Sequence, residues 1–308
     1  MDSLDKAIIL ELSNSCRTSF SDLAKKHDVS VNTIKNRVED LLEKKIIMGF
    51  DVQLKLSLLN ASFALAILYL KDQASREVVS ELGSSPFIMA TGIGVEPEGF
   101  AIAVYRTSTE LSRAVQHLKS NDAVKEVDVF QVLPPPSSME SVPPSKGLNA
   151  LKKIDWKILY HLRWNGRMPL KYLAKLVGKS VPTVRKRLEF MRNHDMIYET
   201  TILNIGAVGE GMVITFGVEI PGLTPDEQLD IEKTVISAFE DNYWASWMSV
   251  DKPLIFLTFQ ASNALEAARI RDGIAGIFPE SQIVAQSISG MWEYFRDFRD
   301  TILEEKAS

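Results

Sequence analysis

The chain contains one stretch of sequence twice, as LDKAIILELSNSCRTSFSDLAKKHDVSVNTIKNRVEDLLEKKII at residues 4–47 and as IDWKILYHLRWNGRMPLKYLAKLVGKSVPTVRKRLEFMRNHDMI at residues 154–197. The two copies align with a constant offset of 150 positions, and thirteen of the forty-four aligned positions are identical. A repeat of this length indicates that one supersecondary unit is used twice. Two copies half a chain apart are what a two-fold device requires.

Each copy is predicted to form three short helices. In the second copy, Ile158 and Leu162 recur at helical spacing, and the Asn165-Gly166 pair breaks the helix. Gly178 is placed to end the next helix, and Ser180 is placed to cap a third helix that has Pro182 in its first turn. The first copy follows the same plan, with Ser30 as the cap. A β-prone run follows each third helix, at residues 46–52 and 196–203, and a strand pair there is expected to form a wing.

The segment after each copy is predicted to follow the order βαββαβ. In the first half, strands are expected at 62–71, 87–95, 99–106 and 123–133, with helices at 74–83 and 108–120. In the second half, strands are expected at 212–220, 244–250, 254–260 and 281–289, with helices at 225–240 and 263–276. This order is that of the split βαβ, ferredoxin-like plan.

The sequence therefore predicts an α+β chain in which two winged helix-turn-helix domains alternate with two ferredoxin-like domains. Five prolines between residues 134 and 147 predict an extended linker. Met291, Phe295, Phe298 and Ile302 share one face of a predicted last helix. The predicted boundaries are 1–53 and 150–204 for the helix-turn-helix domains, 60–134 and 210–290 for the ferredoxin-like domains, 135–149 for the linker and 291–308 for the last helix.

Charge is distributed unevenly along the chain. The whole chain carries a net charge of −5, but residues 151–200 sum to +8 and residues 1–50 sum to zero. Residues 51–150 sum to −3, and residues 201–308 sum to −10. A basic module attached to acidic bodies is typical of a protein that faces a polyanion. A solvated basic face without a ligand is the competing interpretation, and charge alone does not separate the two.

The sequence predicts no metal site, no cofactor and no catalytic group. Its single cysteine, Cys16, excludes a disulfide framework and favours a reducing, cytoplasmic compartment. The four histidines lie far apart on predicted polar helix faces, without metal-ligand spacing. No nucleophile, base and orienting group can be nominated together, so an enzyme is not expected.

The repeated unit has the order of a DNA-binding helix-turn-helix, whose second helix enters the major groove with its N-terminal residues at base edges. Arginine and lysine suit guanine, asparagine suits adenine, and the threonine methyl suits thymine. We expect the first helix to supply more base discrimination and the second to supply more phosphate attraction. The predicted DNA-contact residues are Ser30, Val31, Asn32, Thr33, Lys35, Asn36 and Arg37 in the first copy, and Ser180, Val181, Pro182, Thr183, Arg185, Lys186 and Arg187 in the second.

Each half resembles the Lrp/AsnC (feast/famine) family of transcription regulators. The resemblance rests on motifs that occur in both copies, namely Leu4-Asp5 and Ile154-Asp155, Asp22-Leu23-Ala24-Lys25 and Tyr172-Leu173-Ala174-Lys175, Ser30–Arg37 and Ser180–Arg187, and the closing residues 44–47 and 195–197. It implies double-stranded DNA as the partner and a ferredoxin-like RAM-type effector domain through which protomers pair. It also implies that this chain is two fused protomers, a layout typical of archaea, which form an internal pseudo-dimer that can assemble into homo-oligomers.

The resemblance also implies a small-molecule effector site, because the family carries a Gly-x-x-Asp-like turn between the second and third strands of the effector domain. The second half keeps an acid at this turn, Asp251, whereas the first half has Gly92 and Gly94 in a longer, different sequence. These three residues are the predicted effector contacts. The departure in the first half puts an amino acid effector in doubt.

Two alternatives to a sequence-specific regulator stay open. Sirohaem decarboxylases share this architecture, but the His-Asn-Tyr-x-Arg stretch of that family has no counterpart in residues 88–92 or 245–249. A DNA-organising protein without sequence choice is the other alternative, and the neutral first copy argues against it. The sequence favours a DNA-binding transcription regulator whose two unequal heads bind a pseudo-palindromic site.

Overall fold

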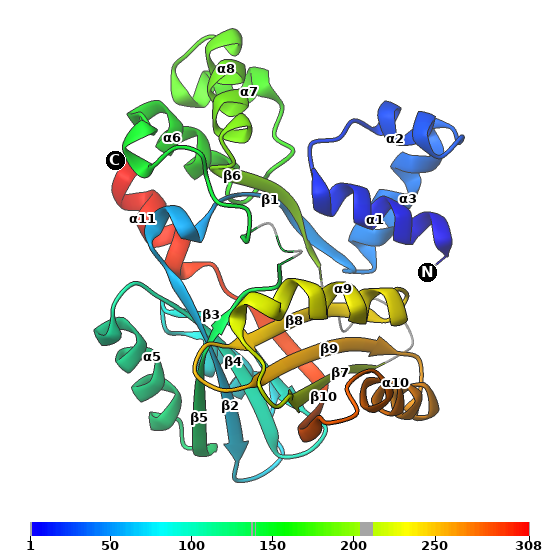
Figure 1. The fold of residues 1–308 in the computed structure, drawn as a ribbon. Helices are drawn as coiled ribbons and strands as arrows, with labels where there is room; N and C mark the ends of the chain where they lie inside the picture. The colour runs from blue at the N-terminus through cyan, green and yellow to red at the C-terminus, as the bar shows by residue number, and fades with distance from the viewer. Residues whose placement is uncertain (1, 137, 139, 204–211, 308) are drawn as a thin grey trace. The chain divides into compact units, whose positions relative to one another are not determined.

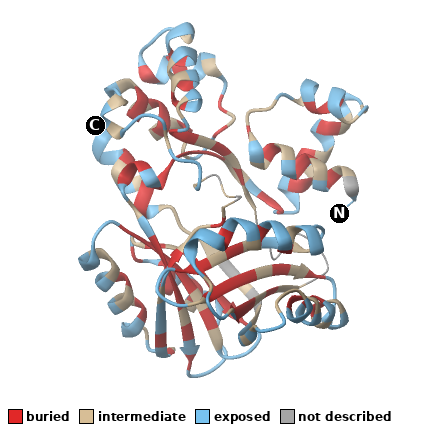
Figure 2. Cartoon of the chain, viewed as in Figure 1, coloured by how far each residue is buried: buried red, intermediate tan, exposed pale blue. Residues whose placement is uncertain are grey.

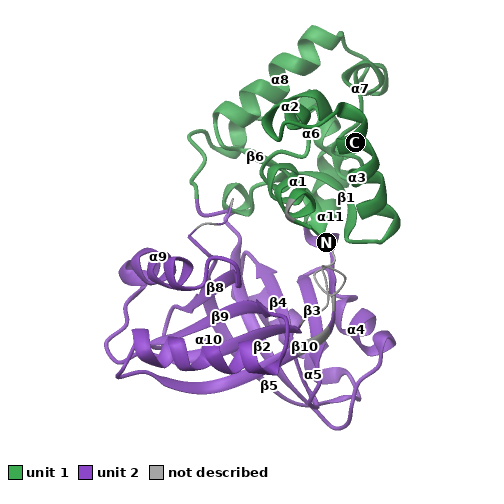
Figure 3. Cartoon of the chain, turned by 90° about the vertical axis from the view of Figure 1, so that its right-hand side faces the viewer, with its two compact units in different colours: residues 1–59, 142–209, 299–308 green, residues 60–141, 210–298 purple. Residues whose placement is uncertain are grey.

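The computed structural model describes residues 2–136, 138, 140–203 and 212–307, and these residues divide into two compact units. Unit 1 is made of residues 1–59, 142–209 and 299–308, and unit 2 of residues 60–141 and 210–298 (Figure 3). The chain therefore passes between the units four times. Unit 1 contains both copies of the repeat, and unit 2 contains both βαββαβ segments.

Unit 1 consists of two three-helix heads, a two-stranded ribbon and a last helix (Figure 1). The first head comprises α1 (Ser3–Asn14), α2 (Phe20–Lys26) and α3 (Val31–Glu43), followed by β1 (Ile47–Leu54) and the 3₁₀ turn η1 (Leu56–Leu59). The second head comprises η2 (Leu148–Ala150), α6 (Lys153–Leu162), α7 (Leu170–Val177) and α8 (Val181–Asn193), followed by β6 (Ile197–Leu203). The last helix is α11 (Asp297–Ala307).

The helix boundaries of the heads follow from their capping residues. Asp2 and Asp5 form a reciprocal capping box at the start of α1, and the Ser19 hydroxyl accepts the Asp22 backbone N–H at the start of α2. Gly178 ends α7 at φ +66°, a left-handed conformation that favours glycine. The predicted apolar stripes form the core of each head, as the red inner faces in Figure 2 show.

The strands predicted after each third helix are present, but among the described residues neither head forms a wing hairpin of its own. Instead, β1 pairs antiparallel with β6, so the two copies supply one strand each to a shared ribbon. Phe50 lies opposite Thr201, and Asp51 lies opposite Thr200. Because Phe50 and Asp51 are equivalent to Thr200 and Thr201 in the repeat, the register has two-fold symmetry. The strand pair expected to form a wing is present, but it forms between the two copies, because each head has one described strand after its third helix.

Unit 2 confirms the predicted βαββαβ order in both halves. The first half runs β2 (Ser62–Leu70), α4 (Arg76–Gly83), β3 (Ile88–Gly94), β4 (Glu98–Tyr105), α5 (Ser108–Ser120) and β5 (Val124–Leu133). The second half runs β7 (Met212–Glu219), η4 (Pro225–Glu227), α9 (Gln228–Ala238), β8 (Tyr243–Ser249), β9 (Leu254–Ala261), α10 (Ala264–Ile277) and β10 (Gln282–Tyr294). The eight strands form one closed sheet in the order β10-β3-β4-β2-β5-β8-β9-β7.

Each half of unit 2 packs two helices on one face of four strands and presents the other face to its counterpart. The helix-facing cores include Leu68 and Val79 in the first half, and Phe216 and Ile270 in the second. Aromatic pairs join the two halves: the ring of Phe63 lies 5.6 Å from that of Trp247, and the ring of Phe130 lies 5.3 Å from that of Phe256. The closed sheet is therefore the internal counterpart of a two-fold dimer core.

The last predicted helix, 291–308, begins later than expected. Residues up to Tyr294 belong to β10, which leaves its ladder with β7 and pairs with β3, where Met291 lies opposite Ile93 and Tyr294 opposite Ala90. The spacing of Met291 and Phe295 suggested a helix face, but both side chains pack on the sheet core. The helix itself, α11, packs in unit 1, where Arg299 donates to the Leu54 carbonyl at 3.1 Å.

Some predicted boundaries lie outside the described residues. Residues 204–211 include the predicted end of the second helix-turn-helix domain and the predicted start of the second ferredoxin-like domain, and residues 137 and 139 belong to the predicted linker. Later linker residues contact the second head, where the Ser145 backbone N–H donates to the His194 carbonyl at 3.0 Å. None of the described helices has the length and apolar character needed to cross a membrane.

Candidate nucleic-acid interface

The two recognition helices, α3 and α8, begin with the same capping arrangement. The Ser30 hydroxyl accepts the Thr33 backbone N–H at 3.0 Å, and the Ser180 hydroxyl accepts the Thr183 backbone N–H at 3.3 Å. In each case the serine and threonine hydroxyls also lie 2.8 Å apart. The predicted serine caps are confirmed, and they fix the first turn of each helix.

Most of the predicted contact residues lie on the exposed side of these helices (Figure 2). The buried Ile34 and Val184 hold the opposite side against the head cores. The exposed members are Ser30, Val31, Asn32, Lys35, Asn36, Ser180, Pro182, Thr183, Arg185 and Lys186. The half-buried members are Thr33, Arg37, Val181 and Arg187.

Arg37 and Arg187 form ion pairs with acidic side chains of their own heads. Arg187 donates through Nε to Asp155 Oδ1 at 2.7 Å, and Asp155 is fully buried. Arg37, at the equivalent position, pairs with Asp2 at 2.7 Å and Asp5 at 3.1 Å. These pairs tie each recognition helix to the first helix of its head. Hydrogen bonding to Asp2, together with the charges of Asp5 and Asp2, raises the pKa of Arg37.

The remaining cations of the two recognition helices differ. In the first head, Lys35 lies 3.7 Å from Glu39, and α3 carries two cations and three acids. In the second head, α8 carries four cations and one acid, and neither Arg185 nor Lys186 forms an ion pair with any described residue. The net charges of the helices are therefore −1 and +3.

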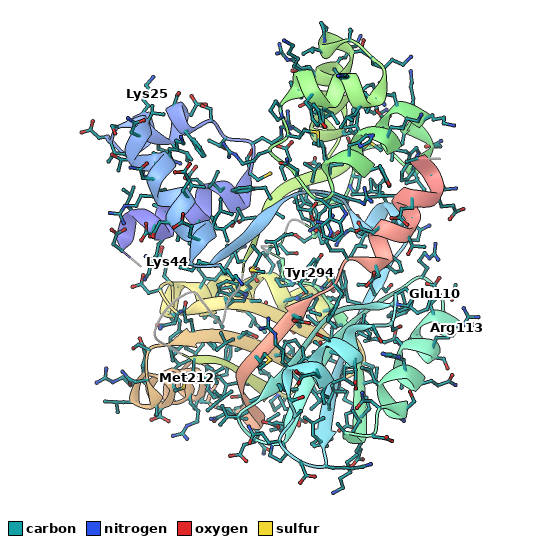
Figure 4. The ribbon with its side chains drawn as sticks, turned by 180° about the vertical axis from the view of Figure 1, so that it is seen from behind. Lys25, Lys44, Glu110, Arg113, Met212 and Tyr294 are labelled. Carbon is teal, nitrogen blue, oxygen red and sulfur yellow. The ribbon has the colours of Figure 1, made fainter. Side chains whose placement is uncertain are left out.

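The second head extends this positive charge onto α7. Three exposed lysines on α7 and its end join the two cations of α8, and none of the five pairs with an acid in the described part of the chain. We call this set the basic surface, made of Lys171, Lys175, Lys179, Arg185 and Lys186. The first head keeps Lys25, equivalent to Lys175, which points away from α2 (Figure 4). The other equivalent positions in α2 and its end are Ser21 and Val29.

The two heads are joined by a reciprocal arginine contact at equivalent positions. Arg17 donates to the Gly166 carbonyl and, at 2.8 Å, to the Met168 carbonyl. Arg167 donates to the Cys16 carbonyl and, at 3.1 Å, to the Thr18 carbonyl. Each arginine therefore donates to the carbonyls of the two residues that flank the equivalent arginine in the other copy. We call this contact the arginine clasp.

Buried groups surround the clasp at the centre of the ribbon. Glu199 accepts from Arg192 at 2.6 Å and lies 3.9 Å from Arg17. Burial, and then the charge of Glu199, raises the pKa of the Cys16 thiol to about 12, so this thiol is protonated at neutral pH. Cys16 is thus a buried packing residue. Burial lowers the pKa of the Arg17 guanidinium.

Gly166 has a role at this junction that its sequence context did not reveal. Its N–H donates to the Phe50 carbonyl at 2.8 Å, and a Cβ at this position would lie only 2.8 Å from the Asp51 backbone nitrogen. Only glycine permits this approach between the copies. The Asn165-Gly166 pair predicts a turn from sequence, but the close contact with β1 depends on tertiary structure.

The three predicted effector residues do not come together. Gly92 and Gly94 lie in β3, between β4 and β10, whereas Asp251 follows β8 at the junction with β5. A Cβ on Gly99 would lie 2.5 Å from the Gly92 carbonyl oxygen, so the backbones are in close contact there. Asp251 is exposed and accepts from the Ser249 hydroxyl at 2.9 Å. No group of three or more His, Cys, Asp or Glu placed to hold a metal occurs within the described residues.

Comparisons with known proteins match this architecture. Residues 1–42 match the family model of the AsnC-type helix-turn-helix domain, and residues 151–198 match that of a winged helix-turn-helix DNA-binding domain. An uncharacterised HTH-type transcriptional regulator from Pyrococcus abyssi is 32% identical over 137 residues, which cover 43% of this chain and 92% of the relative. The chain belongs to the Lrp/AsnC family of helix-turn-helix transcription regulators. A second such regulator, from Pyrococcus furiosus, is 29% identical to this Lrp/AsnC-family chain over 136 residues. The aligned residues make up 43% of this chain and 91% of the relative.

The whole Lrp/AsnC-family chain also has the fold of one solved structure, the siroheme decarboxylase NirDL. That structure aligns with a TM-score of 0.60 over 99% of this chain and 98% of its own, at 13% sequence identity. At this identity the likeness shows a common fold, and it does not carry an activity. It indicates that the tandem arrangement of both units is itself a fold found in another protein.

Proposed function

We propose that this chain is a sequence-specific, DNA-binding transcription regulator that acts as an internal pseudo-dimer on a pseudo-palindromic site. The observation that supports this proposal is that one compact unit contains two identically capped recognition helices. The two-fold register of the β1–β6 ribbon relates these two helices to each other. Two-fold related readers require a site with matching half-sites, about one DNA turn (~34 Å) or a multiple apart. This role places the chain with genomic DNA in the cytoplasm.

We assign different tasks to the two heads. The basic surface of the second head has five cations free of ion pairs with described residues, which suits contact with phosphates. The first head presents Asn32 and Asn36 on a helix of net charge −1, which suits reading of base edges more than non-specific attraction. Arg37 and Arg187 leave the primary contact set in this proposal, because the acids of their own heads hold them.

A binding assay with a control matched in charge, but placed outside the heads, tests the proposal. Fluorescence anisotropy of genomic fragments, selected by the full chain, should report saturable binding that weakens steeply with salt. Arg185→Ala with Lys186→Ala should weaken binding, whereas Lys119→Ala with Lys233→Ala, in unit 2, should not. If no fragment binds at low salt, or if both double variants bind alike, the assignment is wrong.

We further propose that a small-molecule effector, if it is an amino acid, binds at the β5–β8 junction. Asp251 and Lys252 are exposed there and offer one charge of each sign, and the Lys252 ammonium lies 4.8 Å from the Phe130 ring centre. At the β3–β10 junction, Gly92 and Gly94 are buried between paired strands. A thermal-shift screen of amino acids on the wild type and on Asp251→Asn tests this site. An amino acid that stabilises both proteins equally contradicts it.

An enzyme related to siroheme decarboxylase is the second candidate, favoured by the whole-chain fold likeness to NirDL. The four histidines, candidate ligands of an iron tetrapyrrole, lie at the end of α2, on α5, on α6 and at the end of α8, outside the sheet of unit 2. An absorbance titration with an iron tetrapyrrole discriminates the candidates. A saturable Soret shift together with loss of a carboxyl group from sirohaem would support the enzyme and contradict a purely regulatory role.

A further inference from the structure

The last helix, α11, contacts one end of the β1–β6 ribbon through a buried arginine (Figure 1). Arg299 is 6% exposed. Its Nε donates to the Leu54 carbonyl of β1 at 3.1 Å, and its Nη2 donates to the Tyr198 hydroxyl of β6 at 2.8 Å. One guanidinium therefore bonds to a strand from each copy of the repeat.

The Tyr198 hydroxyl continues this network across the ribbon. It donates to the Gln53 side-chain oxygen at 2.7 Å, and Gln53 and Tyr198 lie opposite each other in the ladder. The guanidinium carbon of Arg299 also lies 5.8 Å from the centre of the Tyr198 ring. A buried charge is costly unless its donors are satisfied, so these bonds favour one arrangement of α11 and the two strands.

The same helix is bound to the second head. Arg163, at the end of α6, lies 3.9 Å from Asp300 and 3.4 Å from Glu304 of α11. The Leu303 side chain of α11 is buried. Through α11, the second head is therefore connected to β1, the strand that follows the recognition helix of the first head.

The opposite end of the ribbon has no side chains for the same network. The two-fold equivalents of Gln53 and Tyr198 are Leu203 and Met48, and neither carries an amide or a hydroxyl. The ladder is irregular beside Met48, which is 55% exposed. The Arg299 network is therefore an addition at one end of the ribbon, which the repeat itself does not supply.

We propose that Arg299 is a positioning residue for DNA binding, which holds the two heads at one separation and thereby sets the spacing between half-sites. This inference rests on the proposed function, because spacing matters only if both heads bind the same DNA. Once one head is bound, the other binds in an intramolecular step, and this advantage is lost where the geometry forbids both contacts. A fixed separation therefore makes the affinity depend on spacing.

The separation of the heads can be measured without DNA. Glu39→Cys with Glu189→Cys places spin labels at equivalent, exposed positions of α3 and α8. Double electron–electron resonance should report one narrow distance distribution for this labelled chain. Arg299→Met should lose the single narrow distance. Tyr198→Phe, which removes only the hydroxyl that accepts from Arg299, should broaden the distribution in the same way.

The dependence of affinity on spacing is the second readout. The wild type should bind its selected site about 100-fold more tightly than the same site with half a DNA turn, about 5 base pairs, inserted between the half-sites. In Arg299→Met this ratio should fall below about tenfold, because a loose connection accepts both spacings. The affinity for a single half-site should not change, which separates a positioning role from a general loss of structure.

Arg271→Met is the matched control, because it removes an exposed arginine of α10 in unit 2. It should keep the wild-type distance distribution and the wild-type ratio of affinities. Circular dichroism shows which variants are folded, and Tyr198→Phe decides the test if Arg299→Met is not.

A folded Arg299→Met chain that keeps the narrow distance overturns the positioning role, whether or not the chain binds DNA. A narrow distance that is lost while the spacing ratio stays unchanged contradicts the role in half-site spacing. A wild type that binds no DNA contradicts the proposed function, whereas loss of its narrow distance in Arg299→Met would still support the positioning of the heads by Arg299.

Discussion

The two heads share one helical plan but use their charges differently. In the first head, both cations of the recognition helix pair with acids of the same head: Lys35 with Glu39, and Arg37 with Asp2 and Asp5. In the second head, the arginine that anchors the helix is held by the buried Asp155, while Arg185 and Lys186 remain outside any ion pair with described residues. The two copies therefore share a scaffold but differ in charge, and we propose that the first head reads bases while the second attracts phosphate.

The largest effect on stability is expected when the arginines that anchor the two recognition helices, Arg37 and Arg187, are replaced. Arg187→Ala leaves the fully buried Asp155 without its partner, and breaking a buried pair costs roughly 3–5 kcal/mol. Arg37→Ala should cost less, because the Arg37 side chain is 37% exposed and one of its two partners, Asp2, is half exposed, although the other, Asp5, is buried. Urea denaturation of both variants measures the difference. Equal losses of stability would contradict the distinction between a buried and an exposed anchor.

The second effect concerns the arginine clasp. Arg17→Ala with Arg167→Ala removes the bonds to four carbonyls across the heads, and it should expose the Cys16 thiol to the thiol reagent DTNB. In the wild type, burial keeps this thiol protonated and unreactive until the protein unfolds. The rate of DTNB reaction at pH 8 should rise at least tenfold in the double variant. An unchanged rate would show that the clasp does not hold the junction closed.

The third effect sharpens the assignment of phosphate contacts. Arg185→Ala with Lys186→Ala should reduce the slope of log affinity against log salt by about 1.8, or 0.9 for each lost phosphate contact. Lys35→Ala should change this slope by much less, because Glu39 already compensates Lys35. Anisotropy titrations from 50 to 200 mM salt separate the two. Equal slopes in the two variants would remove the division of tasks.

The smallest effect concerns base discrimination in the first head. Asn32→Ala should reduce the preference for the selected site over a site mutated in one half by about 1–3 kcal/mol, the range for one good base contact. The affinity for unrelated DNA should stay the same. Pro182→Ala, at the equivalent position of α8, is the control and should change neither quantity. A uniform loss on all sequences would assign Asn32 to the phosphates.

The architecture of the heads and of the βαββαβ segments could be predicted because local signals determine it. Serine caps, glycine stops and apolar periodicity act within a few residues, and Ser30, Ser180 and Gly178 stand where those signals placed them. The pairing of β1 with β6 could not be predicted, because strand partners so far apart in sequence leave no local trace. For the same reason, the pairing of residues 291–294 with β3 could not be predicted.

The position of the candidate site could be predicted from the sequence, but which of its side chains form ion pairs could not. Helical spacing places Arg37 and Arg187 near the exposed face, yet their partners, Asp2, Asp5 and Asp155, lie on another helix. The arginine clasp was visible only as an identity between Arg17 and Arg167 in the repeat. Identity between the copies did not by itself identify this contact, because the identical pairs Ser30/Ser180 and Arg37/Arg187 bond within their own heads.

Selection of bound sequences from random DNA by the full chain tests the central claim most directly, that two unequal heads read DNA as one body. The account predicts a motif of two half-sites at one fixed spacing of about one helical turn or a multiple, with one half more sharply defined than the other. Substitution of Asn32 should blur the sharper half. A motif with a single half-site, variable spacing between halves, or no enrichment would contradict it.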